Sequence, residues 1–198
     1  MAVTRWSSQL KPTDTTAKYA ELRIPWQAIM QSYSTKDAAG AGSMLGTGNA
    51  KSVVAEANSS GLGGIAPATG DELDFLVKLP NDFDSTGASY LDVYYQTIAS
   101  ATKGNVINWQ CTYNAVNPNA STAAIGDATT TSGITDPSER TLATGISETF
   151  LFKDTVTIAA STFTAGYGVH TQLTCGGDHA EGELIIQEVV LRYVKLWM

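Results

Sequence analysis

Nucleophilic catalysis requires a general base beside the nucleophile, and the 198-residue chain has two histidines to serve as that base. His170 falls on the polar phase of a predicted strand, and His179 falls in a Gly-Asp-His turn. The sequence has no Gly-x-Ser-x-Gly segment, which in many hydrolases places a serine on a sharp turn. We therefore predict no catalytic residues and interpret both histidines as solvated side chains.

Acidic residues gather in two predicted turns, where carboxylates serve glycosidases or supply oxygen ligands for Ca²⁺. The first turn holds Asp82 and Asp84, and the second holds Asp178, Glu181 and Glu183. Neither turn contains the full Asp-x-Asp-x-Asp-Gly pattern of a calcium loop. Because acids between strands commonly form turns or solvated tips, we predict no metal site and no cofactor.

Tyrosines and cysteines are the other residues with a chemical role to consider. Tyr90, Tyr94 and Tyr95 are spaced to form a sugar-stacking platform, although a tyrosine on a strand more often packs with its hydroxyl at the surface. Cys111 and Cys175 lie far apart and lack metal-ligand spacing. We interpret them as buried, reduced thiols, with a disulfide between neighbouring strands as the alternative.

The composition favours strands joined by turns. Hydrophobic residues make up 43% of the chain and charged residues only 16%, with 18 glycines. The net charge of −7 argues against a nucleic-acid partner, which normally meets a basic surface. The apolar runs are far shorter than a spanning helix, and the polar start has no signal-peptide pattern. We therefore predict no membrane contact and assembly in the cytoplasm.

Alternating apolar and polar residues place most of the strands. The clearest stripe lies within 106–116, where the apolar phase includes Trp109 and Cys111 and the opposite phase is polar. Strands at this spacing, without a long amphipathic helix, are typical of two packed sheets. The sequence predicts an all-β, antiparallel jelly-roll-like β-sandwich with an extended N-terminal arm. Its predicted strands cover 20–26, 72–79, 90–98, 106–116, 149–158, 169–175 and 183–196.

The last predicted strand is apolar on both faces. One phase carries Ile185, Val189, Leu191 and Tyr193, and the other carries Leu184, Ile186, Val190 and Val194. Such a strand is central, or its outer face meets another subunit. We therefore expect a homo-oligomer, with a trimer favoured.

The chain divides into three predicted parts: a docking arm at 1–36, a Gly/Ala/Ser-rich loop at 37–70, and the sandwich domain at 71–198. Residues 1–51 hold six basic and three acidic side chains, whereas the rest of the chain is acidic. Tryptophan and arginine dominate interface hot spots, and cations steer an arm to an acidic partner. The alternative is a solvated tail. The predicted docking residues are Arg5, Trp6, Lys11, Lys18, Arg23 and Trp26.

Residues 71–195 resemble a group of tailed-bacteriophage virion proteins that contain a β-sandwich domain. The resemblance is carried by Leu-Pro-Asn-Asp-Phe-Asp-Ser from Leu79, by Tyr-Leu-Asp-Val-Tyr-Tyr-Gln-Thr from Tyr90, and by Ala-Thr-Lys-Gly-Asn-Val-Ile-Asn-Trp-Gln-Cys-Thr-Tyr from Ala101. The closing strand ends in Leu-Arg-Tyr at Tyr193, which fits the same pattern.

This resemblance implies a non-enzymatic virion structural protein, with a capsid decoration or stabilising protein favoured. The expected partners are the major capsid protein or other virion subunits, and the expected location is the virion, assembled in the host cytoplasm. A receptor- or glycan-binding module of a tail or head fibre is the alternative, and an enzyme ranks third. The resemblance supplies no catalytic residues.

Overall fold

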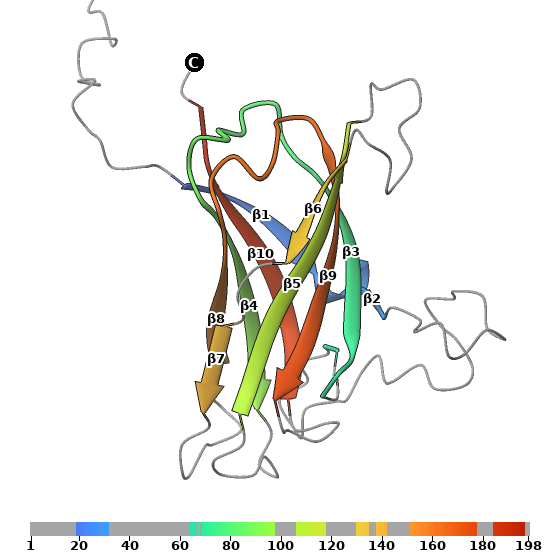
Figure 1. Ribbon diagram of the computed structural model, residues 1–198. Coiled ribbons are helices and arrows are strands. Elements are labelled where there is room, and N and C mark those ends of the chain that lie inside the picture. The colour runs from blue at the N-terminus through green and yellow to red at the C-terminus, as the bar shows by residue number, and fades with distance from the viewer. Residues whose placement is uncertain are drawn as a thin grey trace, which may run out of the picture.

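The computed structural model describes residues 19–31, 64–65, 67, 69–97, 106–117, 130–134, 138–141, 151–177 and 184–196. These residues form two antiparallel sheets packed face to face, so the predicted all-β sandwich is confirmed (Figure 1). The helical content of this part of the chain is a single 3₁₀ turn, η2 (Trp26–Ala28), and no helix there is long and apolar enough to cross a membrane.

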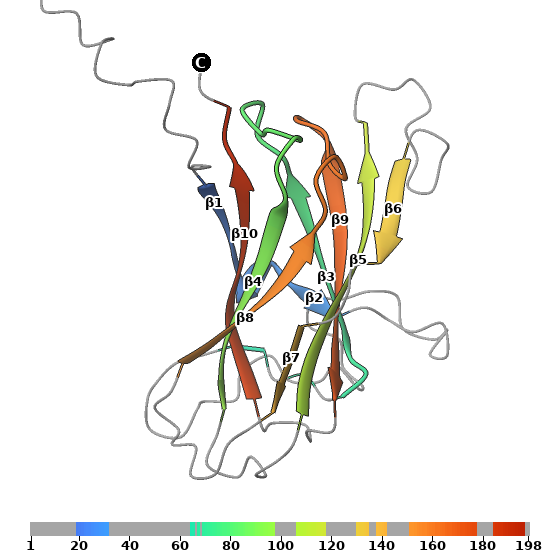
Figure 2. The ribbon, with the colours of Figure 1, turned by 60° about the vertical axis from the view of Figure 1, so that its left-hand side comes forward.

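The chain crosses repeatedly between the two sheets, as in a jelly roll. The strands of both sheets run roughly along the long axis of the molecule (Figure 2). The four-stranded sheet has the order β1 (Tyr19–Pro25), β10 (Leu184–Val194), β4 (Ser89–Thr97), β8 (Leu151–Ile158). The six-stranded sheet has the order β2 (Met30–Gln31), β3 (Glu72–Lys78), β9 (Gly168–Gly177), β5 (Val106–Val116), β6 (Thr130–Ile134), and β7 (Ser138–Thr141) also pairs with β5.

The core lies between the sheets and is built from their apolar phases. Trp109 of β5 is fully buried, and its ring centroid lies 5.6 Å from that of Tyr95 in β4, on the facing sheet. Phe75 of β3 and Leu173 of β9 belong to the same core cluster. The period-2 alternation predicted for these strands therefore identified the inward side chains correctly.

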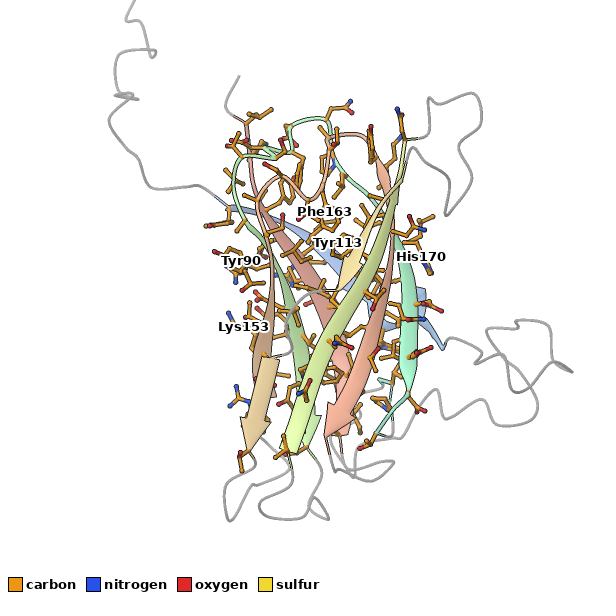
Figure 3. The ribbon with its side chains drawn as sticks, in the orientation of Figure 1. Tyr90, Tyr113, Lys153, Phe163 and His170 are labelled. Atoms are coloured by element: carbon orange, nitrogen blue, oxygen red, sulfur yellow. The ribbon has the colours of Figure 1, made fainter. Side chains whose placement is uncertain are left out.

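Aromatic side chains close one end of the sandwich. Phe83, from the turn after β3, stacks on Tyr193 of β10 with 5.5 Å between ring centroids. Phe163 contacts both Phe83 and Tyr113, and the Tyr113–Phe163 pair lies near the upper end of the sandwich in Figure 3. The predicted turn that holds Asp82 and Asp84 therefore connects two strands and also contributes the buried ring of Phe83 to the core.

The prediction for the faces of β10 was wrong in part, because the strand contains a β-bulge at Gln187. The extra residue changes the phase, so that Leu184 and Ile186 join the core together with Val189, while Ile185 falls on the opposite side. Period-2 counting cannot detect a bulge, because it assumes an unbroken ladder.

The outward apolar side chains of β10 are already covered within the chain. Ile185 is 0% exposed and Val190 is 2% exposed. Ile65 exchanges two backbone hydrogen bonds with Ile186, and a Cβ on Gly64 would collide with the carbonyl oxygen of Ile186 and with Ile185. Only glycine permits this close approach. The apolar outer phase of β10 therefore requires no second subunit, which removes that reason for expecting an oligomer.

Part of the predicted arm belongs to the sandwich. β1 pairs with β10 along all seven of its residues, and Ile24 and Ile29 are buried in the core. β2 extends the other sheet by pairing with β3. The predicted domain start at residue 71 was therefore too late, because long-range pairing draws Tyr19–Gln31 into both sheets. Arg5, Trp6, Lys11, Lys18 and most of the predicted loop at 37–70 lie outside the described residues.

Two further features bear on the sequence predictions. The segment Thr130–Ile134, which lies between the strands predicted at 106–116 and 149–158, forms β6 against β5. Cys111 and Cys175 are buried on neighbouring strands and are not bonded to each other, so the disulfide alternative is not formed. Each cysteine faces a different residue across the ladder, since Cys111 is opposite Leu173 and Cys175 is opposite Trp109. Burial raises the pKa of Cys111 to about 12, which keeps this thiol protonated and unreactive.

We expect the substitution Trp109→Ala to lower the free energy of unfolding by about 3–5 kcal/mol, because it removes a fully buried ring and leaves a cavity. Leu76→Ala is the matched control, since Leu76 is 71% exposed, and its effect should stay within about 0.5 kcal/mol. Urea unfolding followed by circular dichroism measures both. Equal losses in the two variants would contradict the assigned core.

Candidate functional site

The sandwich has two outer faces, one on each sheet, and they differ in how their polar groups are satisfied. Tyr90 and Lys153 lie on the outer side of the four-stranded sheet, and His170 lies on the opposite side of the molecule, on the six-stranded sheet (Figure 3). A face whose polar groups already have partners favours stability, whereas unpartnered groups favour a ligand.

Asp92 of β4 lies at the centre of the four-stranded face, and its side chain is 0% exposed. The Arg192 guanidinium donates two hydrogen bonds to its carboxylate, and Thr155 Oγ1 donates a third at 2.6 Å. Lys153 Nζ lies 3.7 Å away. Burial by itself raises the pKa of Asp92, but the hydrogen bonds and positive charges outweigh burial and lower it. Asp92 is therefore ionised and fully paired.

Aromatic rings hold the Arg192 guanidinium from outside. Its Cζ atom lies 4.8 Å from the ring centroid of Tyr90 and 5.8 Å from that of Tyr19, and these two rings contact each other edge to face. The sugar-stacking platform considered as the alternative for Tyr90, Tyr94 and Tyr95 is not formed by the three rings together, because Tyr95 points into the core and Tyr90 contacts Arg192. The four-stranded face therefore uses its aromatic surface for internal contacts.

A second polar network lies inside the sandwich. Tyr95 donates a hydrogen bond of 2.7 Å to Asp154 Oδ2, and Arg140 Nε donates one of 2.7 Å to Asp154 Oδ1. Arg140 also bonds the Lys153 carbonyl and lies over the Phe152 ring. Because both carboxylate oxygens of Asp154 are engaged and the side chain is only 4% exposed, this network holds β7 against β8 and offers no free base to a substrate.

The outer face of the six-stranded sheet is polar and largely uncharged. On β5 and β9 the outward side chains are partly exposed amides, hydroxyls and one imidazole, and β3 adds two carboxylates, a lysine and the exposed Leu76. We call this the amide face. Its residues are Glu72, Asp74, Leu76, Lys78, Asn108, Gln110, Thr112, Asn114, His170, Gln172 and Thr174.

The centre of the amide face contains two unsatisfied oxygens. Among the described residues, Asp74 Oδ1 and Asn114 Oδ1 are buried and have no hydrogen-bond partner. His170 lies between them, opposite Asn114 in the ladder, with its Nε2 atom 3.4 Å from Asp74 Oδ1. This distance suits an ion pair but is longer than a normal N–H···O hydrogen bond.

The structure separates the other sequence-predicted candidates. Asp82 pairs with Lys195 at 3.0 Å, and Asp84 accepts hydrogen bonds from Thr86, so neither carboxylate is poised for glycosidase chemistry. The acidic cluster at 178–183 lies outside the described residues. Within the described ranges no three His, Cys, Asp or Glu side chains are grouped to hold a metal ion.

The two described docking candidates do not meet at one surface. Arg23 contacts Glu21 and Glu188 at 3.4 Å on the four-stranded face, and Trp26 in η2 packs against the core.

Sequence reasoning missed Asp74 and Asn114 because the polar phase of an amphipathic strand looks like ordinary solvated surface.

No protein-family model matches the chain, and no curated protein matches it. Among solved structures, the chain is similar to the xylan-binding module CBM15, at 13% identity and TM-score 0.46 over 91% of this chain and 100% of that chain. It is also similar to the CBM22-1 and GH10 modules of the Clostridium thermocellum endo-1,4-beta-D-xylanase 10B complexed with xylohexaose, at 7% identity and TM-score 0.43 over 92% of this chain. That match spans 29% of the xylanase chain. TmCBM61 in complex with beta-1,4-galactotriose is similar at 11% identity and TM-score 0.32, over 87% of this chain and 86% of that chain. TM-scores below 0.5 carry no inference about this chain.

We expect the Asp92→Asn substitution to lower the free energy of unfolding at pH 7 by about 1.5–3 kcal/mol, the range for hydrogen bonds to charged groups. The folded-state pKa lies below the ordinary value of 3.8, so the stabilisation is complete above pH 3.8 and is lost as pH falls through the folded-state pKa.

Urea unfolding between pH 7 and pH 2 measures this effect, with the exposed Glu21→Gln as control. The Asp92→Asn variant should lose less stability than the wild type over the acid range. An identical pH dependence in both proteins would contradict the assigned role of Asp92.

Proposed function

We propose that this protein is a non-catalytic binding module that recognises a neutral glycan on the amide face. The single observation that carries the proposal is the unsatisfied centre of that face, where Asp74 Oδ1 and Asn114 Oδ1 have no hydrogen-bond partner among the described residues. Leaving acceptors unpaired away from water costs free energy, and a ligand that supplies donors recovers it.

The chemistry of the amide face matches that of sugar hydroxyls. Amide and hydroxyl side chains both donate and accept hydrogen bonds, as sugar hydroxyls do. Gln110, Thr112 and Asn114 repeat every second residue along β5, which forms a row that an extended chain can follow. Leu76, at 71% exposure, provides an apolar surface for the C–H face of a sugar ring.

The charge distribution supports a neutral ligand. The outward side chains of β5 and β9 include no lysine or arginine, and β3 presents Glu72 and Asp74 beside Lys78. With a net charge of −7 on the whole chain, a polyanion such as nucleic acid meets repulsion without a compensating basic patch.

We expect wild-type protein to be retained by at least one insoluble neutral polysaccharide in a panel that includes xylan and β-1,4-galactan, which are uncharged chains rich in hydroxyl groups. The double variant Gln110→Ala/Asn114→Ala should bind at least tenfold more weakly, because it removes two hydrogen-bonding side chains from the row. Pull-down assays and isothermal titration calorimetry measure the affinities.

The matched control is Glu21→Ala/Thr157→Ala, which removes two exposed side chains from strands of the other sheet. This control should bind like the wild type. Retention of the amide-face variant at full strength, or absence of binding to every polysaccharide in the panel, would refute the proposal.

A structural role in a virion is the second candidate, favoured by the position of β1. Among the described strands this edge strand pairs with β10 alone, and the predicted docking residues Arg5, Trp6, Lys11 and Lys18 precede it in the chain. The arm would then attach the sandwich to the major capsid protein or to another copy, as a trimer, in virions assembled in the host cytoplasm.

We expect the Arg5→Ala/Trp6→Ala variant to attach at least tenfold more weakly than wild type to virus particles that lack this protein. Point substitutions are needed because truncation at residue 36 would also remove β1 and its buried Ile24. Added salt should weaken the wild type further if the cations steer docking. Undiminished attachment of the variant in a co-sedimentation assay would exclude this role for the arm.

A further inference from the structure

The centre of the amide face is set by pairing between three strands. The β3–β9 register places Leu76 opposite His170 and Asp74 opposite Gln172, and the β9–β5 register places His170 opposite Asn114. Asp74 and Asn114 therefore flank His170 from the two neighbouring strands, on the same side of the sheet. We call these three residues the acceptor triad.

Acceptors outnumber donors in the acceptor triad. Ionised Asp74 offers two acceptor oxygens and no donor, the Asn114 amide offers one acceptor oxygen and two N–H donors, and a neutral imidazole offers one N–H and one acceptor nitrogen. The 3.4 Å separation from His170 Nε2 leaves Asp74 Oδ1 without a hydrogen bond, and Asn114 Oδ1 also has none among the described residues. The triad therefore demands at least two donors from outside the protein.

A ligand can reach the acceptor triad because its side chains keep exposed surface. The Asp74 side chain is 15% exposed and that of His170 is 36% exposed. The two unsatisfied oxygens are themselves buried, so contact with a ligand requires these side chains to turn about their broad terminal torsions. Leu76, directly opposite His170, provides the apolar floor beside them.

Two neighbouring hydroxyls on one sugar ring supply the required donors. A carboxylate or sulfate group brings acceptors only, and it also brings negative charge next to Asp74 and Glu72. A carboxylate or sulfate group would leave the acceptors of the triad unpaired and would be repelled by the nearby negative charges. Both effects lower the affinity for an acidic sugar relative to a neutral one.

We propose that the acceptor triad of Asp74, His170 and Asn114 is the specificity centre of the amide face, selecting a vicinal diol of a neutral glycan and excluding carboxylated sugars. This inference rests on the proposed glycan-binding function and adds the residues that choose between neutral and acidic chains.

The test compares matched probes: soluble β-1,4-galactan or cello-oligosaccharide against the same chain oxidised to the carboxylate at C6. By calorimetry, wild-type protein should bind the neutral member at least tenfold more tightly than the oxidised one. Asp74→Ala/Asn114→Ala should lose at least tenfold affinity for the neutral probe. Asp74→Asn keeps an acceptor oxygen but removes the negative charge. This variant should still bind the neutral probe, and the ratio of its affinities for the neutral and the oxidised probe should fall at least threefold.

Thr157→Ala, on β8 of the four-stranded sheet and outside the amide face, serves as the matched control, and melting temperatures within a few degrees confirm that the variants are folded. Failure of wild type to bind any neutral probe in the whole panel would refute the proposed function itself. Neutral binding that survives Asp74→Ala/Asn114→Ala, or equal wild-type affinity for both probes, would overturn the specificity centre alone. Titration with ZnCl₂ and CaCl₂ tests whether the triad binds a metal ion instead of a sugar. Saturable metal binding that is abolished by Asp74→Ala would assign the triad to a cation and overturn the proposal of a diol site.

Discussion

The contact between Trp109 of β5 and Tyr95 of β4 joins the two sheets, and the rest of the architecture depends on burying the side chains around it. Because side chains alternate along a strand, committing Trp109 to the core also commits Gln110 and Thr112 to the outer face. The polar surface is therefore a direct consequence of the packed interior. A shift of the β5 register by one residue would turn its apolar side chains outwards and its polar side chains inwards. The apolar contact between the two sheets would then be lost.

The two outer faces use their polar groups in opposite ways. On the four-stranded sheet, Asp92 and Arg192 pair directly, Lys153 adds a second positive charge, and tyrosine rings cover the guanidinium. These groups satisfy one another, so the face stabilises the sandwich without a ligand. On the six-stranded sheet, Asp74 and Asn114 leave buried oxygens without partners among the described residues. Unmet hydrogen-bonding capacity on an outer face favours a recognition role, and Thr97 Oγ1 and Gln187 Nε2 of the four-stranded sheet also lack partners among the described residues.

The buried carboxylate of Asp154 affects how β8 can pair with other molecules. β8 is an edge strand of the four-stranded sheet, and unpaired edges invite pairing with other chains. An inward-pointing charge on such a strand must be neutralised in place, here by Arg140 from the other sheet and by the Tyr95 hydroxyl. An added strand that displaced Arg140 would leave the buried Asp154 without its cationic partner. The same contacts that hold β7 against β8 thus also discourage unwanted edge pairing.

Much of this architecture follows from local sequence, because alternation of side chains is a property of each strand alone. The inward stripe of β5 and the buried, reduced state of Cys111 and Cys175 were predictable in this way. The bulge at Gln187 and the strand β6 were not, since neither has a local pattern and both depend on the partner strand. The same limit applies to function: Asp92 and Arg192 are 100 residues apart, and Asp74, His170 and Asn114 come from three strands. Sequence alone determined which side chains face outwards on the unbroken strands such as β5, but only the pairing of distant strands decided where a bulge reverses the faces and which side chains meet, because register is set by the packing of both sheets at once.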